Sequence, residues 1–228
     1  IVYNCGAGNV TVNLAAGTST TVGPFPVGSS CTVTEPVLPT PPDNWTFGVP
    51  QISGSPATIV EGDAAAAVAV SVTNSITQDT GYLKISKIFD PLTSGFTGTF
   101  AIVYNCGAGN VTVNLAAGTS TTVGPFPAGS SCTVTEPVLP TPPTGWTFGT
   151  PVIVGSPATI VKGDAAAAVA VSVTNTIIRN QGTIIVDKVT IPSGSLASFE
   201  FNPSWSDANF FLQDASTPHQ VVLGTGAY

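Results

Sequence analysis

The sequence repeats itself with a period of 101 residues, and this period limits what the chain can fold into. Residues 1–78 align without a gap on residues 102–179, and only ten aligned pairs differ. The differing pairs are 27/128, 43/144, 44/145, 49/150, 51/152, 53/154, 61/162, 75/176, 77/178 and 78/179. Near-identical modules in a row are typical of stalks, fibres and multivalent surface proteins. We therefore expect no enzymatic activity on an external substrate.

The repeat divides the chain into three units. Residues 81–101 contain a strand pattern before the second copy, and no counterpart precedes Ile1. We expect an incomplete β-sandwich repeat without its first strand at 1–80, a complete repeat at 81–178, and an incomplete, diverged sandwich at 179–228. We interpret the given sequence as a segment of a longer chain. The alternative is a first unit completed by a strand from a neighbouring chain.

Short Val-, Ile- and Thr-rich runs separated by Ser, Thr, Gly and Pro predict an all-β fold, either a sandwich or a barrel. The link at 176–181 is expected to be about six residues long, which limits how freely neighbouring modules swing. The alanines at 165–168 could start a helix, but the β-branched alternation that follows them favours a strand.

Charge and composition exclude several classes of function. Five Lys or Arg against twelve Asp or Glu give a net charge of −7, which argues against nucleic-acid binding. No apolar run approaches the roughly 18 residues that a membrane span needs. The single histidine, His219, is expected in a solvated turn and cannot supply a Ser-His-Asp triad to each module. We expect no cofactor.

The four cysteines form two equivalent pairs, Cys5/Cys31 and Cys106/Cys132, each separated by 26 residues. Without a CxxC motif or a Cys/His cluster, metal binding is not expected. A disulfide within each module is the preferred interpretation, and buried free thiols are the alternative. Each bridge would contribute roughly 3–4 kcal/mol by the loop-entropy model. Disulfides would place the protein outside the cytosol, at the cell surface or in a secreted filament.

Three polar side chains fall where the strand alternation predicts the core. They are Lys87, Glu136 and Asn175 in the complete unit. The same positions hold Glu35 and Asn74 in the first unit, and Lys188 in the third. Because burying a lone Lys or Glu is expensive, these groups must be paired, neutralised or consumed in a reaction.

An L-x-I-x-K first strand, a C-T-V-T-E strand and a terminal V-T-N strand together resemble CnaB or SpaA-type domains, over residues 81–175. Those prealbumin-like, immunoglobulin-related β-sandwiches build the stalks of bacterial adhesins and pili. The resemblance implies tandem immunoglobulin-like or prealbumin-like β-sandwich modules in an extended array.

The same resemblance implies a self-generated isopeptide bond. Lys87 would attack the side-chain amide of Asn175 and expel ammonia, while Glu136 shuttles protons. In the flanking units Lys188 and Asn74 would be the isopeptide residues, and Glu35 the proton shuttle. The alternative is a Lys–Glu ion pair hydrogen-bonded to Asn, without a covalent bond.

Two functions are compatible with these patterns. One is a structural stalk or extracellular filament, whose partners are other copies of itself or further repeats of the same chain. The other is a multivalent adhesin that binds glycan, a surface or a host protein. A binding repeat should carry clustered exposed aromatic residues or a regular threonine array, and neither stands out in the sequence. We therefore favour the structural role, and the sequence assigns no ligand.

Overall fold

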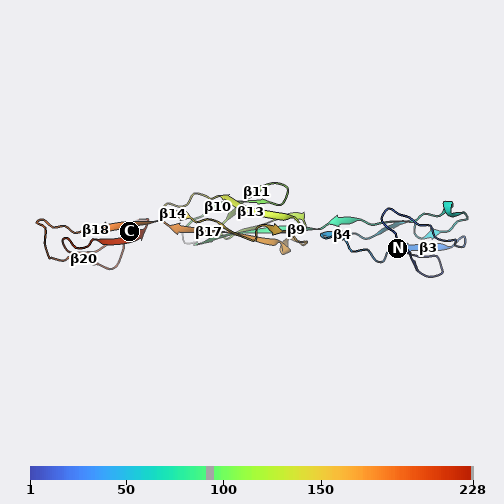
Figure 1. The fold of residues 1–228 in the computed structure, drawn as a ribbon, viewed down its shortest axis with the longest axis horizontal. Helices are drawn as coiled ribbons and strands as arrows, with labels where there is room; N and C mark the ends of the chain where they lie inside the picture. Colours follow the sequence, from blue (N-terminus) through green and yellow to red (C-terminus); the bar gives the residue numbers. More distant parts are fainter. Residues whose placement is uncertain (91–94, 227–228) are drawn as a thin grey trace.

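The protein is described by a computed structural model that covers residues 1–90 and 95–226. The molecule is elongated, and its three units follow one another along the long axis (Figure 1). Strands dominate the described residues, and the all-β prediction is confirmed.

The middle unit consists of two sheets. The first contains β11 (Val111–Ala116), β10 (Thr99–Asn105), β13 (Ser131–Val138) and β16 (Ala158–Thr159), in that order. The second contains β12 (Ser120–Pro127), β9 (Thr80–Asp90), β17 (Val169–Arg179) and β14 (Trp146–Phe148), with β15 (Val152–Val154) also paired to β17. β9 lies between β12 and β17, and it is parallel to β17. The first and last strands of the unit are therefore direct neighbours.

The core lies between these two sheets. Alternate residues of β9 are buried, and Leu83 and Ile85 pack in one cluster with Ile102 and Val134 from the first sheet. A second, aromatic cluster is built on Phe89, Phe100 and Ile177. Because side chains from both sheets share the interior, the unit is a β-sandwich.

The first unit has almost the same sequence but fewer strands. One sheet is kept, as β2 (Val10–Thr11), β1 (Val2–Asn4), β3 (Ser30–Thr34) and β6 (Ala57–Thr58). The other is reduced to two isolated pairs, β4 (Trp45–Phe47) with β8 (Ile76–Gln78) and β5 (Gln51–Ser53) with β7 (Ser71–Thr73). Residues 19–26, identical to β12, form no strand. The reason is pairing, because β12 and β17 both hydrogen-bond to β9 and the first unit contains no such strand.

The described residues of the third unit, 181–226, form two strand pairs. β18 (Gln181–Val186) pairs with β21 (His219–Gly224), and β19 (Phe199–Phe201) pairs with β20 (Phe210–Leu212). The expectation of a solvated turn at His219 is wrong. This residue begins β21, and its ring stacks on Phe210 at a centroid distance of 3.9 Å.

Each junction between units is a single residue. Asp79 separates β8 from β9, and Asn180 separates β17 from β18. The expected six-residue link is wrong, because pairing of Trp146 with Arg179 extends β17 almost to the junction. The Asp79 amide donates to the carbonyl of Asn44, and its own carbonyl accepts from Ala128, both at 2.8 Å. The junction is thus hydrogen-bonded to the unit on either side.

A short 3-10 turn precedes the last strand in both copies, at Ala64–Ala66 and Ala165–Ala167. The strand expected at the alanine run therefore starts later, at Val169. The cause is local, since the carboxylates of Asp63 and Asp164 accept backbone hydrogen bonds that cap these turns.

Candidate functional site

The structure brings the three polar residues of the middle unit together in its interior. Lys87 lies on β9, Asn175 on β17 and Glu136 on β13 of the opposite sheet. Lys87 is 1% exposed and Asn175 is 0% exposed. The ammonium nitrogen of Lys87 lies 3.2 Å from both carboxylate oxygens of Glu136, and it donates to Oδ1 of Asn175. The site therefore spans both sheets of the sandwich.

Strand register explains the meeting of Lys87 and Asn175. In the parallel pair β9–β17, Lys87 is opposite Val173, and Asn175 is opposite Phe89. Lys87 and Asn175 are thus diagonal neighbours on one face, a separation that a long side chain can bridge. The alternation that buries Leu83 and Ile85 also points Lys87 inward.

Aromatic rings surround the lysine. The Phe100 ring centroid is 4.0 Å from Nζ, within cation–π range. Phe89, Phe96, Phe100 and Phe148 contact one another at centroid distances of 5.2–6.1 Å. Sequence reasoning did not connect these rings to the lysine. Two signals were available: Phe89 continues the inward alternation of β9, and Phe100 falls on the inward face of the next long strand.

Burial controls the electrostatics of the site. Desolvation lowers the pKa of Lys87 from its usual value of 10.5, against the opposing effect of the Glu136 carboxylate. A lowered pKa increases the fraction of neutral amine, which is the nucleophilic form of a lysine.

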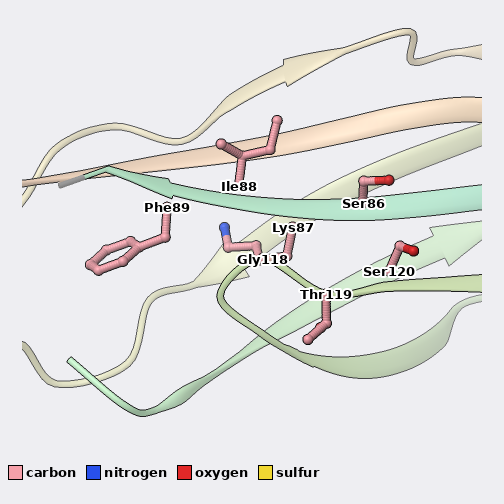
Figure 2. A pocket seen from close by; sticks show the side chains of 7 residues that line it. All are labelled: Ser86, Lys87, Ile88, Phe89, Gly118, Thr119 and Ser120. Carbon is pink, nitrogen blue, oxygen red and sulfur yellow. The ribbon is translucent and has the colours of Figure 1, made fainter. Parts of the chain in front are cut away.

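The backbone around Lys87 is held by the turn between β11 and β12. The Lys87 amide donates to the carbonyl of Thr119 at 2.8 Å, and the Gly118 amide donates to the carbonyl of Lys87 at 3.0 Å. This turn and residues 86–89 line a hollow of ≈ 330 Å³. The lining side chains are shown in Figure 2. These bonds fix the register of β9, and with it the position of the lysine.

The contacts suit an attack by the amine on the amide. Nζ of Lys87 touches Oδ1 of Asn175, one covalent bond from the carbonyl carbon. Nδ2 of Asn175 is buried without a hydrogen-bond partner among the described residues. The amide nitrogen that would leave is therefore not held in place, and the Glu136 carboxylate is within reach for proton transfer.

The flanking units hold only parts of this set. In the first unit, Nδ2 of Asn74 donates to Oε1 of Glu35 at 3.3 Å, and Asn74 is exposed. In the third unit, Lys188 donates to the carbonyl of Val189 and lies 4.2 Å from the Phe199 ring centroid. Of the described residues, neither Glu35 nor Asn74 meets a lysine, so the complete set occurs in the middle unit.

Both predicted disulfides are confirmed, as Cys5–Cys31 and Cys106–Cys132. Cys106 directly follows β10 and Cys132 lies in the adjacent β13, so this bridge joins two strands of the first sheet. Lys87 and Asn175 belong to the second sheet. The disulfide and the polar site thus connect different pairs of strands.

Residues 1–90 and 95–226 contain no group of three or more His, Cys, Asp or Glu side chains placed to hold a metal ion. Within the same residues, no helix has the length and apolar character needed to cross a membrane.

Among the solved structures that are similar to parts of the chain are two bacterial proteins. The Bacillus anthracis TIE protein is 15% identical with a TM-score of 0.34, and the match covers 70% of this chain and 30% of that one. A bacterial adhesin from Mobiluncus mulieris, containing intramolecular disulfide, isopeptide and ester bond cross-links, is 18% identical with a TM-score of 0.31. That match covers 54% of this chain and 49% of the adhesin. The chain thus spans less than half the length of either structure, and no curated protein matches it.

A sequence family matches the two repeated units, over residues 1–77 and 83–177. These ranges together cover most of the chain, and each lies within one of the two repeated units. The chain belongs to the family described as domain of unknown function DUF5979, of which it carries two successive copies.

Proposed function

We propose that this chain is a length of an extracellular bacterial surface stalk or filament, stiffened by disulfides and by a Lys–Asn isopeptide bond. The observation that carries the proposal is the buried contact among Lys87, Glu136 and Asn175, which connects the first and last strands of one unit. The elongated arrangement of the units and their single-residue junctions also support it. The two disulfides support an oxidising location outside the cell.

The proposed reaction needs no external reagent. The neutral amine of Lys87 attacks Cγ of Asn175, a new N–C bond forms, and the bond from Cγ to Nδ2 breaks. Glu136 accepts a proton from the attacking amine and delivers one to the departing nitrogen, which leaves as ammonia. The products are one secondary amide and one ammonia, so atoms and charge balance. The activity is intramolecular, since each site reacts once.

A bond between residues 87 and 175 would resist unfolding of the whole unit. If the loop-entropy model for disulfides applies, closing this loop contributes about 4–5 kcal/mol. Tension between the ends of the unit would pass through covalent bonds, and the hydrogen bonds between β9 and β17 would be spared. Such a module suits a stalk that must keep its length under load.

Intact mass spectrometry of the purified, reduced chain tests the proposal. We expect a mass about 17 Da below that calculated from the sequence, which is the loss of one ammonia. The variant Asn175→Ala is the matched control and should show its full calculated mass. Proteolysis should also release a branched peptide that joins Lys87 to Asn175. If the chain without substitutions shows its full calculated mass, the isopeptide bond is excluded and the ion pair between Lys87 and Glu136 remains as the interpretation.

The structural role is preferred over a multivalent adhesin because of the exposed surface. The exposed large hydrophobic residues of the described chain are mostly Val, Leu and Ile, and Trp45 and Phe211 are the aromatic exceptions. Among the described residues, no cluster of exposed aromatic side chains is thus repeated from unit to unit. Electron microscopy of native material would separate the two roles. Filaments with an axial repeat that matches the module support the stalk, and isolated soluble chains contradict it.

A further inference from the structure

The outer face of the second sheet in the middle unit carries exposed aliphatic side chains. Ile88 of β9 is 47% exposed, and Val152 and Val154 of β15 are 56% and 61% exposed. Ile88 and Phe89 lie on opposite sides of β9 (Figure 2), so Ile88 points away from the core. The strand register places Val152 opposite Thr174 of β17, and Thr174 opposite Ile88. A row of β-branched side chains thus crosses three strands of this face.

Differences between the two repeats create much of this surface. Three of the ten differing pairs give the middle unit Val152, Val154 and Ile178 where the first unit has Gln, Ser and Thr. Ile178 is also exposed, on the outer side of β17. The polar residues of the first unit lie in strands too, in β5 and β8. Because the strands form with polar residues at these positions, the exposed aliphatic side chains indicate a contact surface.

Two charged residues lie at opposite ends of this face. Lys84 and Asp90 are both exposed on β9, and six residues of extended strand separate their Cα atoms by about 20 Å. Every other charged residue of the unit has a partner: Lys87 has Glu136, Lys162 has Asp79, Asp164 has the amides that it caps, and Arg179 has the Thr225 carbonyl. Among the described residues, Lys84 and Asp90 have none.

The two charges are placed symmetrically. Lys84 and Asp90 are each three residues from Lys87 along the strand. A two-fold axis that lies between two facing sheets and crosses β9 at the level of Lys87 sets Lys84 of each copy against Asp90 of the other. Facing sheets pack about 10 Å apart, a gap that a lysine and an aspartate side chain can bridge together. Both ends of the face thus meet an opposite charge.

The exposed valines have the same symmetry. Lys87 lies opposite Val173 of β17, and Val173 lies opposite Ile153 of β15. The same axis therefore passes midway between Val152 and Val154, so that Val152 of each copy meets Val154 of the other. One arrangement thus makes both the aliphatic centre and the charged ends of the face complementary to themselves.

We propose that this outer face binds the same face of a second copy of the chain, with the two β9 strands antiparallel. The contact uses side chains on the opposite side of β9 from Lys87, so it does not depend on the isopeptide bond. The strands β12, β9, β17 and β15 present roughly 500 Å² per copy, below the roughly 800 Å² of a standard interface. We therefore expect weak self-association, with a dissociation constant between about 10 μM and about 1 mM.

Sedimentation equilibrium of the full chain over a concentration series measures this association. The triple variant Val152→Gln, Val154→Ser, Ile178→Thr carries the residues that the first unit has at these positions, so the middle unit should keep its fold. We expect its association constant to fall at least about tenfold, because the aliphatic contact is lost. Circular dichroism and thermal unfolding of the same samples are the folding control.

Charge reversal tests the orientation of the two copies. In pairs of its own copies, Lys84→Glu sets acids against each other, and Asp90→Lys sets lysines against each other. Each variant alone should associate at least about tenfold more weakly than the chain without substitutions. An equimolar mixture of the two should associate again, since every charged contact then joins an acid to a lysine. The double variant should also associate with itself, and high salt should reduce these differences.

A zero-length carbodiimide crosslinker identifies the contact directly. It joins an amine to a carboxylate that touches it as an amide, while the carbodiimide takes up one water. The separation of about 20 Å between Lys84 and Asp90 prevents this coupling within one strand. When isotope-labelled and unlabelled chains are mixed, we expect crosslinked peptides that join Lys84 of one kind of chain to Asp90 of the other.

Three results would overturn the proposal. The first is no association at concentrations up to about 1 mM. The second is association that the triple variant and the charge reversals leave unchanged, which would assign the contact to another surface. The third is association without a crosslink between labelled and unlabelled chains at Lys84 and Asp90, which would exclude the antiparallel arrangement.

Discussion

Asn74 and Asn175 occupy the same position in two nearly identical units, yet Asn175 is fully buried and Asn74 is exposed. Local sequence does not cause the difference, because residues 68–74 and 169–175 are the same. The cause is β9, which pairs with the strand that carries Asn175. The buried environment of Lys87 and Asn175 is thus a property of the completed sandwich, in which β9 and β17 are paired.

Replacing the lysine should destabilise the middle unit far more than replacing a lysine on the other face of the same strand. Lys87→Gln removes the nucleophile, and if the bond forms we expect a loss of about 4–5 kcal/mol in the free energy of unfolding. Lys84→Gln is the matched control, because Lys84 is on β9 but exposed. Urea unfolding followed by intrinsic fluorescence measures both. Equal, small effects would contradict a covalent role for Lys87.

The stability of a chain that cannot react should depend on pH in a defined direction. Asn175→Ala leaves Lys87 able to titrate, with its pKa lowered by burial. Between that lowered pKa and 10.5 the unfolded chain binds more protons, so the free energy of unfolding rises as pH increases through this window. Denaturation at a series of pH values measures the slope. The double variant with Lys87→Met should lose it.

In the chain without substitutions, the same pH series reports whether the Lys87 amine has been converted into an amide. A secondary amide does not titrate, so we expect the rise attributed to Lys87 to be absent. A slope equal to that of Asn175→Ala would show that the lysine remains a free amine.

The disulfides should stabilise their own units independently. Replacing Cys106 and Cys132 with Ser should cost the middle unit about 3–4 kcal/mol. The matched pair, Cys5 and Cys31, should affect the first unit alone, since each bridge lies within one module. Unfolding monitored by amide exchange resolves the two units. A bridge whose loss destabilised both units equally would indicate strong coupling across the junction.

The two junction residues occupy equivalent positions, and Asp79 of the first junction corresponds to Asn180 of the second. Asp79 accepts from the Thr46 hydroxyl at 2.6 Å and pairs with Lys162 at 3.0 Å. Asn180 keeps the equivalent bond from Thr147, also at 2.6 Å. Asp79→Asn should therefore retain the threonine bond, lose the solvent-screened ion pair with Lys162, and leave the thermal unfolding temperature nearly unchanged. Thermal unfolding checks this, with Thr46→Val as the variant that removes the retained bond.

Acid should weaken this junction. The hydrogen bond from Thr46, and then the bond from Lys162, lower the pKa of Asp79 below 3.8. Stability from a carboxylate of this kind is present above 3.8 and is lost as pH falls through the lowered pKa. NMR titration of the Asp79 carboxyl should show the shift, and Lys162→Gln should move its pKa back towards 3.8.

Much of the middle unit follows from its sequence. Alternation along the strands predicts that Lys87, Glu136 and Asn175 face inward, and the equal spacing of the cysteines predicts their pairing. The inward positions depend on period-two patterning, and the cysteine pairing depends on the repeat spacing; both can be read directly from the sequence.

The pairing between strands that are distant in the sequence could not be predicted from local alternation. Residues 19–26 have the sequence of β12 without its structure, because β12 requires β9 as a partner. The one-residue junction likewise depends on β14, which extends β17 to Arg179. The aromatic surroundings of Lys87 combine residues from 89 to 148, and their convergence is a product of the sandwich.

The parallel pairing of β9 and β17 has a mechanical consequence. The chain enters the middle unit at the start of β9 and leaves at the end of β17, and both strands run in the same direction. Pulling the ends apart slides one strand along the other, so the pairs from Leu83–Val169 to Asp90–Thr176 are loaded in shear, all at once. A hairpin pulled at its two ends opens like a zipper, one pair at a time. Even without a crosslink between Lys87 and Asn175, this topology places the strongest resistance to unfolding along the axis of the array.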